Sequence, residues 1–455
     1  MTTKYWYSFL VRRCSTVAVV ILLLESCSEI EIKWTRDVDA LGPGNYLVNS
    51  VSAMKDEIYI IGTYWQDKKD SRCFAAKYDA DGSPDWFSVF ESPGIRQAAG
   101  IQIVASMTSA EPLEARSKVY VLVQTGDTNG HQSVVLATYD TLGNVHWQNT
   151  VISSEGTLHA ALLSDHVGNL YVAGWERDVE DRPSIYIGKY NESGDVVWFT
   201  KYYNEEINFT DLRCDMMQSN YLVLAGVLKP SGELFSMKYD GSGQFMGYTI
   251  HEGLKVSELC GVKIDPQGYV YITASISDPE NGEDYLTVVY DESNNLQWMS
   301  QYDGAAHRDD KPKAIAIDEA LSVYVAGTSE DAQGMTVITV VKYDSTGSPV
   351  WVANPPQKEA ADLLFLEPRY IPKGRYDDAR YFHVAGTTGC KAILARCNLE
   401  GVFSWSEEYG QNRTMTEPTA ISGHVLAFQS IEDGISRASI SKFGPSTIMG
   451  LARWD

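Results

Sequence analysis

One short segment of the sequence gathers side chains that could bind a ligand or move protons. His307, Arg308, Asp309 and Asp310 follow one another between two predicted strands. A carboxylate beside a histidine or an arginine can bind a cation or a sugar, or act as a general acid and base. We take these four residues as the candidate binding site. The simpler interpretation is that they are solvated loop charges.

Other charged segments occupy comparable places in the chain. Glu205-Glu206 and Arg413 fall in equivalent connections between predicted strands, so convergence of distant segments would assemble a larger site. Residues 176–181 are equally charged, and the whole chain is acidic. That background favours the interpretation as solvated surface charge.

The local motifs of known catalytic and metal centres are missing. None of the eight histidines forms a His-x-His or His-x-x-x-His pair, and the seven cysteines contain no Cys-x-x-Cys, so no zinc motif is present. Asp79-Ala80-Asp81-Gly82 begins like a calcium loop but lacks the distal glutamate, which favours a simple turn. Gly-x-Ser-x-Gly and Gly-x-x-x-x-Gly-Lys are also absent. The sequence therefore predicts no catalytic residue, no metal site and no cofactor.

The composition excludes several classes of protein. The 455 residues are 44% hydrophobic and 11% aromatic, which is typical of a globular protein and not of a disordered or collagen-like chain. Sixty acidic against 37 basic residues give a net charge of −23, and such a surface repels phosphate backbones. We expect no nucleic-acid partner.

The N-terminus has the pattern of an export signal. Residues 1–26 contain three basic side chains followed by the apolar run 17–24, which is too short for a convincing membrane span. The segment Leu24-Glu25-Ser26-Cys27 resembles the bacterial lipobox, in which the cysteine is acylated and becomes the first residue of the mature protein. Glu25 departs from that pattern, which usually has a small or apolar residue there. An ordinary signal peptide or a retained signal anchor is the alternative.

This resemblance implies a lipid-anchored protein. Cys27 would carry the acyl chains, such as palmitate, and residues 27–29 would form a tether ahead of the folded domain. Two or three acyl chains hold a soluble domain stably on a bilayer, whereas a single chain does not. Ser28 in place of aspartate favours the outer membrane under enterobacterial-type sorting. We expect the protein in the bacterial cell envelope, on either side of that membrane.

One repeat organises the rest of the chain, residues 30–455. The segment 343–351 reads Tyr-Asp-x-x-Gly-x-x-x-Trp, and this spacing recurs along the sequence. Its copies begin at Tyr78, Tyr139, Tyr190, Tyr239, Tyr290, Tyr343, Cys397 and Phe443. Asn294 replaces the glycine of one copy, and Gly247 stands at the tryptophan position of another. We predict that Asp or Asn opens a tight turn in which the glycine supplies a positive φ.

Each copy also contains short apolar runs upstream of the turn. Leu170-Tyr171-Val172-Ala173-Gly174 is one example, and its β-branched and aromatic residues predict a strand. The uninterrupted apolar character predicts that both faces of this strand are covered. With the strands that flank the turn and a less regular strand before the run, each repeat supplies four antiparallel strands.

Repeated four-stranded units without helical periodicity predict an all-β fold, namely a β-propeller of eight four-stranded blades in one domain. Residues 30–35 match the tryptophan strand but have no preceding partner strand, so we expect them to close the ring as the outer strand of the last blade. Residues 451–454 compete for that place. Seven blades is the second choice, and an open solenoid is the remaining alternative.

The repeat resembles that of a known family. Asn169-Leu170-Tyr171-Val172-Ala173-Gly174 with Lys189-Tyr190-Asn191 is the copy most similar to the bacterial SBBP propeller repeat. The resemblance covers residues 30–455 and implies the propeller fold. It implies little about activity, because members of that family are mostly uncharacterised exported or surface-linked proteins.

Two functional hypotheses follow from the sequence. The leading one is a non-catalytic envelope lipoprotein whose propeller is a binding or scaffold platform for a protein or a glycan. The alternative is a hydrolase or lyase acting on polysaccharide, with its active site at the axial end of the propeller where the segment 307–310 is expected.

Overall fold

The computed structural model describes residues 30–445 except for 55–56, 68–69, 93, 108–116, 141, 166–167, 205–207, 218–220, 279–281, 319, 356–360, 370–380, 389–390, 410–414, 423–424 and 433–434. The predicted signal peptide, Cys27 and residues 451–454 lie outside the described residues. Within the described ranges every long regular element is a β-strand, as the sequence predicts. A search of these ranges finds no helix with the length and apolar character needed to cross a bilayer.

Most strands form separate four-stranded antiparallel sheets in chain order. These sheets are β10–β13 (Thr157–Ser164, Leu170–Arg177, Pro183–Tyr190, Val196–Tyr202), β14–β17 (Phe209–Met217, Tyr221–Leu228, Glu233–Asp240, Phe245–Lys255), β18–β21 (Glu258–Ile264, Val270–Asp278, Gly282–Tyr290, Leu296–Tyr302), β22–β25 (Asp310–Ile317, Val323–Glu330, Thr336–Tyr343, Pro349–Ala353) and β26–β29 (Ala361–Arg369, Tyr381–Thr388, Lys391–Asn398, Phe403–Tyr409).

Two further sets of four strands share one sheet. They are β2–β5 (Asn45–Met54, Glu57–Asp67, Asp70–Tyr78, Pro84–Val89) and β6–β9 (Ile95–Met107, Ser117–Asp127, Gln132–Tyr139, Val145–Ser154). Each set is antiparallel within itself, and the single parallel pairing of Ser71 with Gln97 links the two sets. This contact is local, so each set has the same strand order as the separate sheets.

The last sheet combines both ends of the described chain. Strand β1 (Ile30–Val38) pairs antiparallel with β32 (Ile435–Pro445), which continues to β31 (Val425–Glu432) and β30 (Met415–Ser422). In this register Trp34 lies opposite Lys442, just as Trp351 lies opposite Lys342 in the pairing of β24 with β25. The N-terminal strand thus has the register of a repeat tryptophan strand.

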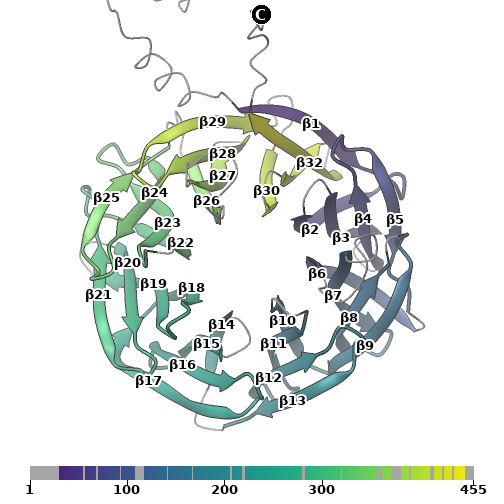
Figure 1. The fold of residues 1–455 in the computed structure, drawn as a ribbon, viewed down its shortest axis with the longest axis horizontal. Helices are drawn as coiled ribbons and strands as arrows, with labels where there is room; N and C mark the ends of the chain where they lie inside the picture. The colour runs from purple at the N-terminus through teal and green to yellow at the C-terminus, as the bar shows by residue number, and fades with distance from the viewer. Residues whose placement is uncertain are drawn as a thin grey trace, which may run out of the picture.

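Figure 1 shows the sheets side by side around a central axis, with first strands such as β2, β14 and β22 nearest the axis and fourth strands such as β13 and β21 outermost. The chain folds as a β-propeller, which confirms the fold expected from the repeat. The second strand β11 is covered on both faces: residues 170–174 are all buried, and Trp175, which follows them, is half-buried. Core clusters extend across neighbouring sheets, as with Val223 of β15 and Ile272 of β19.

The repeat motif turns the chain in the way its residues predict. In the 343–351 copy, Oδ1 of Asp344 accepts hydrogen bonds from the amides of Thr346 (2.9 Å) and Ser348 (3.0 Å), and Gly347 has a φ of 82°. Asp79 binds two backbone amides in the same manner, so the Asp79–Gly82 segment is a turn.

The same motif also joins each sheet to the next. The tryptophan of one copy packs against the turn glycine of the following copy in the pairs Trp86 and Gly143, Trp147 and Gly194, Trp198 and Gly243, Trp298 and Gly347, and Trp351 and Gly401. The indole N–H of Trp198 donates to the carbonyl of Gly241 (3.3 Å), and Lys189 donates to the same carbonyl (3.4 Å). The lysine, glycine and tryptophan of the repeat therefore hold adjacent sheets together.

Candidate functional site

The segment chosen from the sequence lies in the connection from the outer strand β21 to the inner strand β22. Residues 303–309 cross one end of the propeller between these strands, and the amide of His307 donates to the carbonyl of Gly304 (2.9 Å) to form a turn. His307 itself has a φ of 50°, in the left-handed region. The turn places the four predicted residues next to the start of β20 and β22.

Two of the four predicted residues are engaged in surface ion pairs. Arg308 pairs with Glu330. Asp309 lies 3.1 Å from Nζ of Lys311 and accepts a hydrogen bond from the amide of Glu283 (3.2 Å). Lys311 also lies 3.5 Å from a carboxylate oxygen of Glu283. These residues brace the connection against the start of β20.

The other two predicted residues meet around a carboxylate that the sequence analysis did not select. Nδ1 of His307 lies 2.6 Å from Oδ2 of Asp303. Asp310 is only 1% exposed, and its Oδ2 accepts a hydrogen bond from the amide of Gly304 (2.6 Å). The connection therefore folds back so that Asp303 and Asp310 approach each other.

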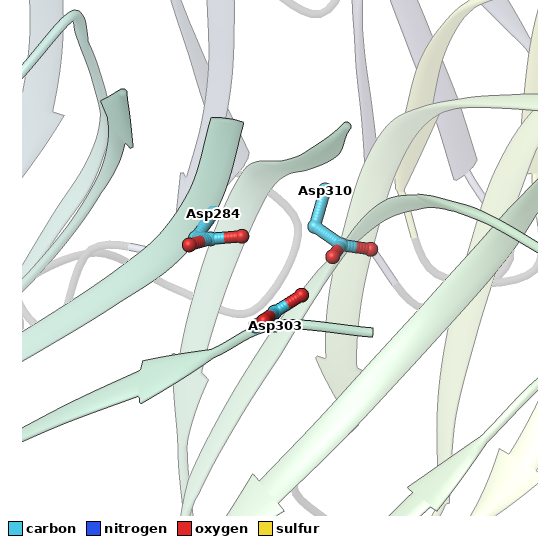
Figure 2. A group of neighbouring side chains, drawn as sticks. All are labelled: Asp284, Asp303 and Asp310. Carbon is cyan, nitrogen blue, oxygen red and sulfur yellow. The ribbon is translucent and has the colours of Figure 1, made fainter. Parts of the chain in front are cut away.

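A third carboxylate completes this group. Asp284, near the start of β20, is also 1% exposed, and its Oδ2 accepts a hydrogen bond from Nε2 of Gln301 on β21 (2.7 Å). One oxygen each of Asp284, Asp303 and Asp310 lies within 4.8 Å of the others. Figure 2 shows the three carboxylates converging from different elements. We call these three residues the aspartate group.

Burial, together with the closeness of like charges, determines the electrostatics of the group. Burial raises the pKa of Asp310 above its ordinary value, and the charges of Asp284 and Asp303 raise it further, while Ser329 and the Gly304 amide act in the opposite direction. The hydrogen bond to Asp303 raises the pKa of His307. The site therefore favours a proton or another positive charge among these carboxylates.

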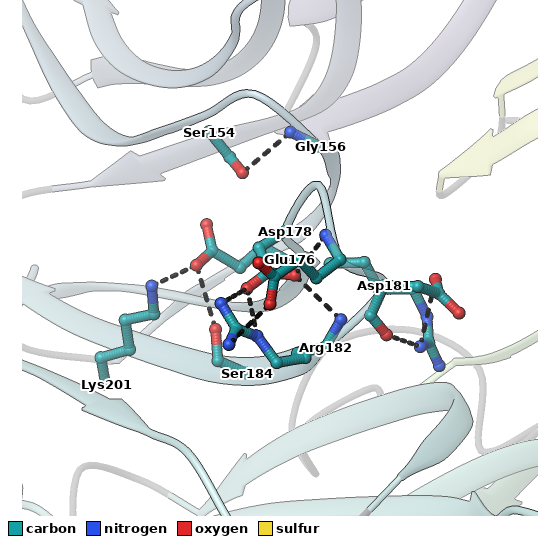
Figure 3. A network of polar contacts seen from close by, with 10 residues as sticks. Ser154, Gly156, Glu176, Asp178, Asp181, Arg182, Ser184 and Lys201 are labelled. Atoms are coloured by element: carbon teal, nitrogen blue, oxygen red, sulfur yellow. Dashed lines mark hydrogen bonds and ion pairs between the residues drawn. The ribbon is translucent and has the colours of Figure 1, made fainter. Parts of the chain in front are cut away.

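Another sheet shows how a buried carboxylate is neutralised within the same fold. Glu176 of β11 accepts a hydrogen bond from Ser184 (3.0 Å) and pairs with Lys201 of β13 (Figure 3). In the strand register, Lys201 lies opposite Tyr186 of β12, and Gln301 lies opposite Leu286 of β20. Lys201 and Gln301 occupy equivalent positions, because each stands eleven residues after the repeat tyrosine of its own copy. Where the β10–β13 sheet has a cation, the β18–β21 sheet has a neutral amide.

The sequence analysis found part of this site. Asp284 and Asp303 were missed because neither belongs to a recognisable motif. A usable signal was present for Asp303, which follows a tryptophan strand within the same connection as His307. Asp284 stands out only when the copies are aligned. It lies six residues before the repeat Tyr290, and the equivalent position in two other copies is Ser184 or Val337, neither of which is acidic. Glu205, Glu206 and Arg413 lie outside the described residues.

The described thiols do not add a nucleophile to the site. Burial raises the pKa of Cys214, Cys260 and Cys397 to about 12. A thiol with so high a pKa has little reactive thiolate at neutral pH. Chemically, the aspartate group can bind a cation or exchange protons.

A second surface of interest is the circumference of the propeller. Several consecutive outer strands expose large apolar side chains, and we call these residues the apolar rim. They are Val196, Val197 and Phe199 on β13, Phe245, Met246, Tyr248 and Ile250 on β17, Leu296 and Met299 on β21, and Val350 and Val352 on β25. In Figure 1 these four strands follow one another along the outside of the ring.

Comparisons with known proteins identify no family. No family model matches the chain, and no curated protein matches it. Among solved structures, the chain is similar to the β-propeller domain of the trilobed protease from Pyrococcus furiosus, with 9% identity, a TM-score of 0.44 and coverage of 79% of this chain and 98% of the other.

Two other solved structures show the same degree of likeness. A mutant of Synechocystis apocarotenoid oxygenase has 8% identity and a TM-score of 0.46, covering 87% of this chain and 96% of its own. The WD40 domain of Toxoplasma gondii coronin has 10% identity and a TM-score of 0.40, covering 93% and 88%. Such values carry no argument about what this chain binds or does.

Proposed function

We propose that the protein is a non-catalytic, lipid-anchored scaffold of the bacterial cell envelope, and that its propeller binds a partner protein through the apolar rim. The lipobox-like segment ending at Cys27 supports the anchor, and Ser28 in place of aspartate supports an outer-membrane location under enterobacterial-type sorting. The observation that carries the binding function is the apolar rim itself. Large apolar side chains gathered on an exposed surface are typical of interaction sites.

The rim favours one kind of partner. The rim strands β13, β17, β21 and β25 are the outermost of their sheets, so each has an edge that an added strand can pair with. The chain has a net charge of −23, which favours a partner with basic groups around its apolar contacts. We therefore expect an extended apolar segment of a basic envelope protein, and binding of a glycan instead would count against this choice.

We also propose that the ring has eight blades and is closed by β1. The pairing of β1 with β32, in the register of the other tryptophan strands, supports this arrangement. Thr35 and Ser441 lie opposite each other, with their hydroxyl oxygens 2.7 Å apart. Thr35→Cys with Ser441→Cys should form a disulfide under oxidation, whereas failure to cross-link would favour an open ring or seven blades.

Site-specific photo-cross-linking in envelope preparations of the native organism tests the rim. The repeat provides a matched control, because Phe199, Tyr248 and Gln148 all stand nine residues after the first position of their copies. A photoreactive residue at position 199 or 248 should cross-link one discrete protein band, whereas the same residue at 148 should not. All three positions lie on outer strands, so they differ mainly in apolar surroundings.

A second variant separates binding from non-specific adhesion. Met246→Ser combined with Ile250→Ser should remove the cross-link formed from position 199, on the neighbouring strand, while leaving the fold intact because both side chains are exposed. Equal cross-linking from positions 148, 199 and 248, or persistence of the band in the double variant, would contradict the proposal.

The aspartate group favours one alternative function, a hydrolase or lyase acting on polysaccharide at the axial end. Asp310 has a raised pKa beside two other carboxylates, which is the environment of a general acid. Turnover of any member of a panel of envelope and plant polysaccharides, with loss in Asp310→Asn, would favour this enzyme over the scaffold. Absence of turnover in wild type would contradict the enzyme function.

A further inference from the structure

We propose that the aspartate group binds one Ca²⁺ ion and thereby fastens the β21–β22 connection to β20. The ligands are one carboxylate each from Asp284, Asp303 and Asp310, which come from three successive parts of the chain. This proposal is independent of the rim and of the lipid anchor. It also goes beyond the sequence analysis, which expected no metal site because no local motif encodes one.

The carboxylates are oriented before any ion binds. Oδ2 of Asp284 accepts from Gln301 (2.7 Å), Oδ2 of Asp310 accepts from the Gly304 amide (2.6 Å), and Oδ2 of Asp303 lies 2.6 Å from Nδ1 of His307. One oxygen of each carboxylate is thus held by a protein donor. These contacts restrain the direction in which the carboxylates point, as outer contacts do in metal sites.

An independent observation points to a missing ligand. Asp310 is only 1% exposed, and its buried Oδ1 accepts no hydrogen bond. Oδ1 of Asp303 is also buried and also accepts no hydrogen bond. Figure 2 shows these two carboxylates near each other. A buried carboxylate oxygen without a partner is costly, and a bound cation would satisfy both.

The cationic side chains of the connection are committed elsewhere. Arg308 pairs with Glu330, and Lys311 lies between Asp309 and Glu283. The equivalent of Lys201, which pairs with buried Glu176 in the β10–β13 sheet, is the neutral Gln301 here. His307 contacts only Asp303 among the three.

The ligand chemistry favours Ca²⁺ over softer or smaller ions. Carboxylate oxygens are hard ligands, and no histidine nitrogen or thiol of the described residues joins the group. Ca²⁺–oxygen distances of about 2.3–2.6 Å allow ligands on opposite sides to be about 4.6–5.2 Å apart, whereas Mg²⁺ at about 2.0–2.1 Å allows only about 4.2 Å. The three oxygens lie within 4.8 Å of one another, a spacing of the size that ligands of one Ca²⁺ ion span.

Calorimetric titration of the purified full-length protein, stripped with chelator, tests the proposal with CaCl₂ and MgCl₂ as probes. We expect one Ca²⁺ per chain with a Kd on the order of 10⁻⁴ M, in the range of weak extracellular sites, and at least tenfold weaker binding of Mg²⁺. Terbium luminescence excited through tyrosine gives a second readout, because Tyr285 and Tyr302 lie beside the group.

Matched variants locate the ion. Asp303→Asn and Asp310→Asn should each weaken Ca²⁺ binding at least tenfold, whereas Asp309→Asn, one residue away and 51% exposed, should change it less than twofold. Asp303→Asn is the more tolerant variant because its side chain is partly exposed, so it remains informative if Asp310→Asn fails to fold. No saturable Ca²⁺ binding, tighter binding of Mg²⁺, or equal binding by wild type and folded Asp303→Asn would overturn the proposal.

Discussion

Trp298 of β21 packs against Gly347 in the turn of the next sheet, so closely that a Cβ atom built on the glycine would lie 2.5 Å from the indole ring. The glycine therefore meets two requirements at once. Its φ of 82° favours a residue without a side chain, and its position beneath the ring leaves no room for one. The first requirement belongs to the turn, and the second belongs to the contact between sheets.

Gly347→Asn separates these requirements. Asparagine tolerates the left-handed region, but its Cβ meets Trp298, so we expect a loss of about 1–3 kcal/mol in unfolding free energy from overpacking. Gly130→Asn is the matched control, because Gly130 has a φ of 92° in the same type of turn and nothing within 4 Å of an added Cβ. Urea denaturation of both variants measures the difference.

Gly347→Val combines both penalties, since a β-branched residue resists a positive φ and its Cβ also meets the ring. It should be the least stable of the three variants. Equal stability of Gly347→Asn and Gly130→Asn would show that the turn alone explains the glycine and that the tryptophan contact is unimportant.

Both irregular copies of the repeat meet at one joint. Gly247 lies opposite Lys238, the place of the tryptophan in other copies, and Asn294 takes the place of the glycine in the following turn with a φ of 64°. Where the tryptophan is absent, the turn no longer needs a glycine. The two exceptions are visible in the sequence, but their partnership is not, because repeat spacing does not reveal which turn a tryptophan contacts.

The propeller was predictable because its information is local and repeated. Strand patterns, turn residues and spacing recur, and each copy corrects ambiguity in the others. The aspartate group was only partly predictable. Asp310 and His307 stand out as neighbours in one charged loop, whereas Asp284 joins them through strand pairing nearly twenty residues upstream of Asp303. A site assembled from single residues leaves no repeat or motif to recognise.

The ion pair between Lys201 and Glu176 provides a test of how buried carboxylates are balanced in this fold. Lys201→Gln copies the residue found at position 301 and leaves Glu176, 7% exposed, without its cation. We expect a loss of about 1–3 kcal/mol, less than for a fully buried pair because Lys201 is 45% exposed.

A second substitution shows whether charge is the cause. Glu176→Gln added to Lys201→Gln should recover most of the loss in urea denaturation, because no buried charge remains unpaired. Lys255→Gln, on an exposed position of β17, should change stability by no more than about 0.5 kcal/mol. If the double variant is no more stable than Lys201→Gln alone, packing and not charge explains the effect.

Metabolic labelling tests the lipid anchor predicted at Cys27. Cells that express the full chain with an alkyne-bearing palmitate analogue should yield labelled, membrane-associated protein, and Cys27→Ser should abolish the label completely. Cys14→Ser is the control, because Cys14 lies within the predicted signal peptide and its substitution should leave labelling unchanged. Unlabelled protein released in soluble form after cleavage would instead indicate an ordinary signal peptide.

The raised pKa of Asp310 predicts a specific dependence of stability on pH. Burial, followed by the charges of Asp284 and Asp303, raises this pKa in the folded state above its value in the unfolded chain. The ionised group therefore destabilises the fold at neutral and alkaline pH, and this penalty is relieved as the pH falls through the raised pKa. Asp310→Asn removes the penalty while retaining an oxygen that can accept from the Gly304 amide.

In chelator, Asp310→Asn should accordingly be more stable than wild type at pH 8, and the difference should shrink as the pH is lowered toward 4. Urea denaturation at a series of pH values measures the difference in unfolding free energy between the variant and wild type. Distant titratable groups contribute equally to both proteins, so their contributions cancel in this difference. Added CaCl₂ should reverse the order at pH 8, because only the wild type retains all three carboxylates to bind the ion. A difference that is independent of both pH and Ca²⁺ would mean that Asp310 is already neutralised within the protein.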